Sequence, residues 1–254
     1  MKILNKLFDK VNDNNSNIEL AESLFSTLGV GGDIPDKYIR EIEKIKAKCE
    51  TRQDVLNEVI KLCGNPNTPR KRYLIAKAYS WSNIEYNKNA IESLESYLHG
   101  ELYSEIYKRN LLYKNEKEGK RKHLSIMYQM LGDAYDKDRN LDKALTAYKK
   151  CLEFTPESQV PYIKIANIFR KKNDLDSAIK ILEAAISSKY YHKVEYKTID
   201  GLSYNPPMYN DDFIVAINSY YEKYLEMKKE DMYIDLEKVR GDNEWVGDIG
   251  KVLI

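Results

Sequence analysis

The chain has 254 residues, and its 41 Lys and Arg residues are balanced by 40 Asp and Glu residues, which leaves a formal net charge of +1. This balance excludes an overall electrostatic attraction to nucleic acid or to an anionic membrane. No apolar run approaches the ~20 residues of a membrane span, and the charged N-terminus lacks the apolar core of a secretory signal, so we expect a cytoplasmic protein.

The N-terminal part of the chain is expected to be helical but irregular. Residues 1–34 are expected to be loosely ordered apart from a short amphipathic helix near residues 18–28. Residues 35–68 are expected to form a helical hairpin, in which Asp36 caps the first helix and Thr51 caps the second. This hairpin would serve as an N-terminal cap or as a degenerate repeat.

Two consecutive segments, residues 125–158 and 159–192, share one pattern of residue sizes with a period of 34. In each segment, four positions have the spacing of one helix face and three have the spacing of a second helix face. Asn140 and Asp174 are placed to cap the second helix, and small residues stand where two antiparallel helices approach most closely. The paired positions are Tyr128 and Tyr162, Leu131 and Ile165, Gly132 and Ala166, Tyr135 and Phe169, Ala144 and Ala178, Tyr148 and Leu182, and Cys151 and Ala185.

This pattern resembles the tetratricopeptide repeat (TPR) family, most closely over residues 125–158. The resemblance implies an all-α fold, a TPR-type helix-turn-helix solenoid wound as a right-handed superhelix. The TPR region would span residues 69–192 with an inserted helix at about residues 100–122, and the turn at residues 82–88 is about two residues longer than in the family. The earlier, weaker repeat follows the family order through Ile75, Ala76, Tyr79, Ala90, Leu94 and Tyr97.

Residues 193–254 depart from the repeat pattern and are predicted to form a divergent C-terminal cap. Alternating apolar and polar residues over residues 194–204 indicate a small β-hairpin, with Asp200 and Gly201 at its turn. The helical spacing of apolar residues over residues 213–225 predicts a capping helix for the end of the stack. An acidic tail completes the chain.

Residues suited to catalysis are few and scattered. The three cysteines have neither CxxC spacing nor histidine partners at metal-ligand spacing, and no phosphate-binding GxxxxGK[ST] sequence occurs. The three histidines lie on different elements and are expected to be solvent-facing or helix-capping: His99, His123 and His192. We therefore expect no catalytic residue, no cofactor and no metal.

The TPR resemblance implies a concave groove lined by the first helix of each repeat. Its lining positions are the second, fifth, ninth, twelfth and thirteenth of that helix. Here these positions are Arg70, Tyr73, Lys77, Ser80 and Trp81; Ile126, Gln129, Asp133, Asp136 and Lys137; and Val160, Ile163, Asn167, Arg170 and Lys171. All of these except Ser80, Ile126 and Val160 form the predicted groove set. The mixture of rings, amides and charges suits a peptide ligand.

The resemblance thus implies a non-catalytic scaffold or adaptor that binds a partner protein or peptide of unknown identity. A peptide-sensing regulator and a helical enzyme of unknown activity stay open as alternatives, as does a homo-oligomer formed through the solenoid ends. Some family members clamp a chaperone's C-terminal carboxylate. The corresponding positions here keep only scattered basic residues, so such a clamp is not expected: Tyr73, Lys77, Met130, Val160 and Lys164. The abundance of Lys, Ile, Asn and Tyr is typical of a low-GC bacterium.

Charge is unevenly placed along the chain. Residues 108–122 hold seven basic and two acidic side chains, whereas residues 230–248 hold seven acidic and two basic ones. Both segments are interpreted first as solvated surface. A sharper hypothesis is that the acidic tail competes with an outside ligand for the groove or for the basic segment. Nucleic-acid binding by the basic segment is weakly supported, since stacking aromatic residues are missing from the pattern.

Overall fold

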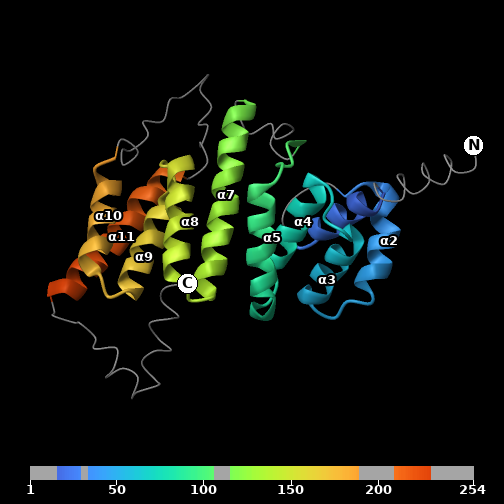
Figure 1. Ribbon diagram of the computed structural model, residues 1–254, viewed down its shortest axis with the longest axis horizontal. Coiled ribbons are helices and arrows are strands. Elements are labelled where there is room, and N and C mark those ends of the chain that lie inside the picture. The colour runs from blue at the N-terminus through green and yellow to red at the C-terminus, as the bar shows by residue number, and fades with distance from the viewer. Residues whose placement is uncertain (1–15, 30–33, 106–114, 189–208, 230–254) are drawn as a thin grey trace, which may run out of the picture. The chain divides into compact units, whose positions relative to one another are not determined.

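The structure is a computed structural model that describes residues 16–29, 34–105, 115–188 and 209–229 (Figure 1). Within these ranges the chain forms helices, turns and short connections, and no strand. The predicted all-α class is therefore confirmed, while the predicted β-hairpin at residues 194–204 lies outside the described residues. The chain divides into two compact units, Met1–Thr155 and Pro156–Ile254.

The first unit begins with a helix over residues 16–26 and continues through further helices that pack in antiparallel pairs. The helices are α2 (Asp36–Lys46), α3 (Arg52–Cys63), α4 (Pro69–Ser80), the 3-10 helix η1 (Ile84–Tyr86), α5 (Asn87–His99), α7 (Glu116–Lys137) and α8 (Leu141–Phe154). Helix α3 contacts α2 and α4, α4 contacts α5, α5 packs on α7, and α7 packs on α8.

Local sequence sets the ends of α2 and α3. The Thr51 side chain accepts a hydrogen bond from the Asp54 N–H and the Asp54 carboxylate accepts one from the Thr51 N–H, so a capping box begins α3 as predicted for Thr51. The predicted cap at Asp36 is wrong. Pro35 holds the cap position without a side-chain hydrogen bond, and Asp36 lies in the first turn, where its charge favours the positive end of the helix.

The longer turn between α4 and α5 folds into the 3-10 helix η1. Asn87 follows it directly as the first residue of α5 and is buried. Its side-chain amide donates a hydrogen bond to the Ala134 carbonyl on α7 over 2.9 Å. The extra residues therefore lead into a contact that fixes α5 against α7.

Helix α7 begins earlier than the repeat pattern predicts. It starts at Glu116, where the Asn115 side chain accepts a hydrogen bond from the Glu118 N–H, and it runs unbroken for 22 residues to Lys137. The predicted inserted helix is thus wrong for residues 116–122, which form the first two turns of α7. The part of the predicted insert at residues 106–114 lies outside the described residues.

Close packing within the pair α7 and α8 depends on Gly132. A Cβ atom at this position would lie 2.5 Å from the nearest ring atom of Tyr148, which is fully buried. The Tyr148 hydroxyl also donates a hydrogen bond to Asp133 over 2.7 Å, so the ring is held in place. The small residue predicted at the helix contact is therefore required there.

The turns inside the two repeats have the same backbone geometry. Arg139 and Asn173, which are 34 residues apart, both have left-handed conformations, with φ of 58° and 60°. Each turn is followed by the predicted cap, because the Asn140 side chain accepts from the Lys143 N–H and the Asp174 side chain accepts from the Ser177 N–H. The 34-residue period thus appears in the backbone as well as in the side chains.

The second unit contains α9 (Gln159–Lys171), α10 (Leu175–Ile186) and α11 (Tyr209–Lys229). Ala166 on α9 and Ala178 on α10 are fully buried, as predicted for the contact between paired helices. Helix α11 packs against both α9 and α10, with Ile217 and Tyr224 fully buried. The helix predicted over residues 213–225 is therefore present.

Candidate interaction surface

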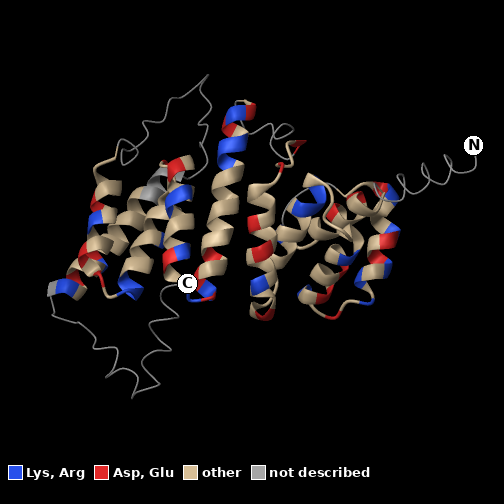
Figure 2. Ribbon diagram, viewed as in Figure 1, with Lys and Arg blue, Asp and Glu red and all other residues tan. Residues whose placement is uncertain are grey.

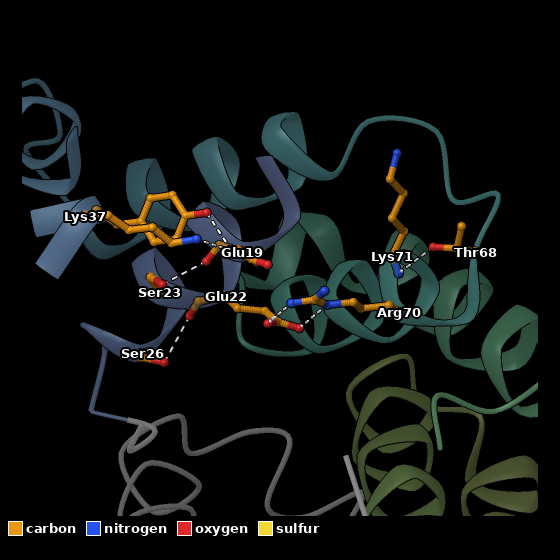
Figure 3. A network of polar contacts seen from close by, with 9 residues as sticks. Glu19, Glu22, Ser23, Ser26, Lys37, Thr68, Arg70 and Lys71 are labelled. Carbon is orange, nitrogen blue, oxygen red and sulfur yellow. Dashed lines mark hydrogen bonds and ion pairs between the residues drawn. The ribbon is translucent and has the colours of Figure 1, made fainter. Parts of the chain in front are cut away.

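The helix over residues 16–26 lies against the side of α4 that carries predicted groove residues. Glu22 forms an ion pair with Arg70, whose Nε donates to a Glu22 carboxylate oxygen over 2.7 Å (Figure 3). Phe25 packs on Trp81 with ring centroids 5.3 Å apart. The hydrogen bond to Glu22 raises the pKa of Arg70. Arg70 and Trp81 are thus engaged by the chain itself.

The same N-terminal helix is fixed to α2 by a second set of polar contacts. Glu19 accepts hydrogen bonds from Lys37 and from the Tyr38 hydroxyl, each over 2.7 Å (Figure 3). These bonds lower the pKa of Glu19. Because Tyr38 and much of the N-terminal helix are buried, this helix is an integral part of the first unit.

Tyr73, the next predicted groove residue on α4, is buried in an aromatic cluster. Its ring centroid lies 5.4 Å from the His123 ring, 5.7 Å from the Tyr97 ring and 6.1 Å from the Tyr103 ring. The Tyr103 N–H donates to the Tyr97 hydroxyl over 3.1 Å, and that hydroxyl lies 2.7 Å from His123 Nε2. Tyr73 therefore contributes to the core.

His123 corrects the expectation that the histidines face solvent or cap helices. It is buried, and burial together with the nearby charge of Lys77 lowers its pKa to about 4. The imidazole is neutral at pH 7, which suits a ring packed among tyrosines. His99 is exposed at the end of α5, as expected, and His192 lies outside the described residues.

Lys77 projects its ammonium group between aromatic rings. Its Nζ atom lies 5.1 Å from the centroid of the Phe25 ring and 5.6 Å from that of the Tyr73 ring. The side chain is half-buried, and burial lowers its pKa. In the described part of the chain, no carboxylate lies within ion-pair distance of Lys77.

The predicted groove residues on α7 differ in how far their side chains are exposed to solvent. Asp133 accepts the Tyr148 hydroxyl hydrogen bond and so faces α8. Gln129 and Asp136 are half-buried, whereas Lys137 is exposed. Ile126, which the predicted set left out, is an exposed large apolar residue on this helix, with 45% of its surface accessible. Its apolar character at an outward helix position was a signal already present in the sequence.

A contact between α4 and α7 joins these residues into one surface. The Ser80 hydroxyl on α4 lies 3.6 Å from the Met130 sulfur on α7, and Met130 stands one helical turn from Ile126. Ser80 is one turn from Lys77 on α4. We call this surface the α4–α7 face and define it by Lys77, Ser80, Ile126, Gln129 and Met130.

In the second unit, α11 contacts predicted groove residues of α9. The Tyr224 hydroxyl donates to the Asn167 side-chain oxygen over 2.6 Å. The Nε atom of Arg170 is buried and has no hydrogen-bond acceptor within the described ranges. Ile163 is half-buried and Lys171 is exposed. The structure thus brings Asn167 and Arg170 to the contact between α9 and α11.

Charged residues of both signs are spread along the helices, as the visible faces of α2 and α5 show in Figure 2. Several ion pairs are contacts within one helix at its surface, such as Lys61 with Glu58 and Lys150 with Glu153. Such exposed pairs contribute little to stability. The desolvated Lys77 differs from them in having aromatic rings as its neighbours.

Residues 126–158 and 161–192 match the family model of the tetratricopeptide repeat. The chain therefore contains two TPR repeats, at the positions that the 34-residue period predicted. The matches cover about a quarter of the chain, and they do not include the weaker repeat at α4 and α5. Proteins built from TPR repeats generally mediate protein–protein interaction.

No curated protein matches the sequence. Among solved structures, the chain is similar to MamA 41-end from Desulfovibrio magneticus RS-1, with 19% sequence identity over 59% of this chain and 68% of that chain. The TM-score of this match is 0.38. Among the described helices, none combines the length and the apolar character needed to cross a membrane.

Proposed function

We propose that this protein is a non-catalytic interaction module of the cytoplasm that binds a segment of a partner protein on the α4–α7 face. The observation that carries the proposal is Ile126, a large apolar side chain exposed beside the half-buried Met130. Covering such a side chain removes apolar surface from water, at about 25 cal/mol for each Å².

Polar groups of the same face suit an extended peptide. The Gln129 amide can both donate and accept, so it can pair with the backbone of a ligand. Ser80 and Lys77 border the apolar patch on the side of α4. An apolar centre with a polar rim is the usual arrangement of a protein interface.

The test is selection of binders from a displayed library of random peptides, presented both within a loop and with a free C-terminus. Dissociation constants of the selected peptides are measured by fluorescence polarisation with the full chain. We expect Ile126→Glu to weaken binding at least tenfold, because a carboxylate would replace the apolar centre of the interface.

A matched control is Ile84→Glu, since Ile84 is an even more exposed isoleucine of the same unit, with 74% of its surface accessible. This variant introduces the same charge on η1 and is expected to bind as the wild type does. The proposal would be refuted if both variants weakened binding equally, or if the selected peptides bound Ile126→Glu as tightly as the wild type. Either result would place the binding site elsewhere.

A further inference from the structure

Lys77 is a half-buried cation with no carboxylate within ion-pair distance among the described residues. Removing an ammonium group from water costs free energy unless an anion or several acceptors replace the water. Its neighbours include the rings of Phe25 and Tyr73, which interact with a cation more weakly than a carboxylate does.

The titratable groups around Lys77 do not provide that anion. His123 on α7 is neutral at pH 7, and its own pKa is lowered in part by the Lys77 charge. On the N-terminal helix, the Glu22 carboxylate is occupied by Arg70. Burial is the single cause that moves the Lys77 pKa, and it moves it downward, opposite to the effect of a nearby carboxylate.

We propose that the bound segment carries a carboxylate that pairs with Lys77, next to an apolar side chain that covers Ile126. This inference rests on the proposed function and adds the chemical class of its ligand, an acidic peptide. The aromatic walls lower the local dielectric, so a carboxylate reaching Lys77 forms a stronger ion pair there than at an open surface. A neutral or basic segment would remove the ammonium group from water without supplying an anion, and would be selected against.

The experiment compares a selected acidic peptide with its amide counterpart, in which each Asp or Glu is replaced by Asn or Gln, on the wild-type chain. We expect the amide peptide to bind about tenfold more weakly, which is the value of one charge-assisted contact. We expect C-terminal amidation of the same peptide to leave its affinity unchanged, because the carboxylate that pairs with Lys77 belongs to an Asp or Glu side chain. Binding that is lost on amidation and kept in the amide counterpart would overturn the inference.

Protein variants give the complementary measurement. Lys77→Met keeps the aliphatic length and removes the charge, so it should bind the acidic and amide peptides equally, whereas Lys77→Arg should keep the preference. Raising the salt concentration should weaken acidic-peptide binding to the wild type more than to Lys77→Met. Circular dichroism of each variant checks that the helices are intact.

The two proposals fail in different ways. The acidic ligand is overturned, and the interaction surface kept, if the selected peptides lack acidic residues and bind wild type and Lys77→Met equally, while Ile126→Glu still weakens their binding. Peptides that bind regardless of Ile126→Glu overturn the surface and, with it, the inference about its ligand.

Discussion

Gly132→Ala gives the sharpest test of the helix packing in the first unit. The added Cβ would lie 2.5 to 2.9 Å from three ring atoms of Tyr148, closer than atoms in proteins approach. Overpacking of this kind costs roughly 3 kcal/mol, while alanine gains about 1 kcal/mol over glycine inside a helix. We therefore expect a net loss of about 2 kcal/mol in the free energy of unfolding.

The assay is urea unfolding followed by circular dichroism at a helix-sensitive wavelength. A double-mutant cycle with Tyr148→Leu tests the cause, because removing the ring removes the clash. Gly132→Ala should then be neutral or stabilising in the Tyr148→Leu background. If Gly132→Ala raised the stability of the otherwise wild-type chain, helix propensity would outweigh packing and the close contact between α7 and α8 would be refuted.

Lowering the pH from 6.5 to 4 should destabilise the wild type by up to about 3 kcal/mol more than it destabilises His123→Phe. The reason is that the unfolded chain binds a proton on His123 below pH 6.5, whereas the folded chain does so only near pH 4. Urea unfolding at several pH values checks this, and an equal pH dependence of the two chains would contradict it. Asn140→Ala should lower the stability by about 1 kcal/mol through loss of the α8 cap, measured in the same way, and no loss would argue against the cap. Arg139→Gly should raise the stability by about 0.5 kcal/mol, since glycine adopts the left-handed conformation at lower cost; a lower melting temperature would contradict this. Deleting residues 230–254 should tighten the binding of an acidic peptide if the acidic tail competes for the same cations, and unchanged affinity would reject competition.

Regular features of the fold could be predicted because local sequence determines them. The spacing of Tyr128, Leu131 and Tyr135 predicts one helix face, and Asn140 predicts where the next helix begins. The start of α7 was missed because residues 116–122 carry mostly charged side chains, so their helical period is weak. The prediction that Asp36 caps α2 is wrong because Pro35 holds the cap position, with φ of −60° and ψ of 135°.

The candidate surface was harder to predict because it depends on contacts between distant segments. A position in a repeat indicates which side of a helix a residue occupies, but it cannot show that Glu22 pairs with Arg70 or that Tyr224 reaches Asn167. The position rule also ranked polar residues above Ile126, whose exposed side chain lies one helical turn from Met130 on the α4–α7 face. The burial of His123 likewise follows from contacts with Tyr73 and Tyr97, which are distant in sequence.

The N-terminal helix over residues 16–26 also decides how binding experiments must be designed. A chain trimmed to begin at α4 would keep Arg70 and Trp81 but lack Glu22 and Phe25. Arg70 would then lose its carboxylate and Trp81 would lose its ring partner, which creates a cationic and aromatic patch that the intact protein does not display. Acidic or aromatic peptides captured by such a trimmed chain would be replacing the protein's own helix, so the affinities that describe this protein are those measured with residues 16–26 in place.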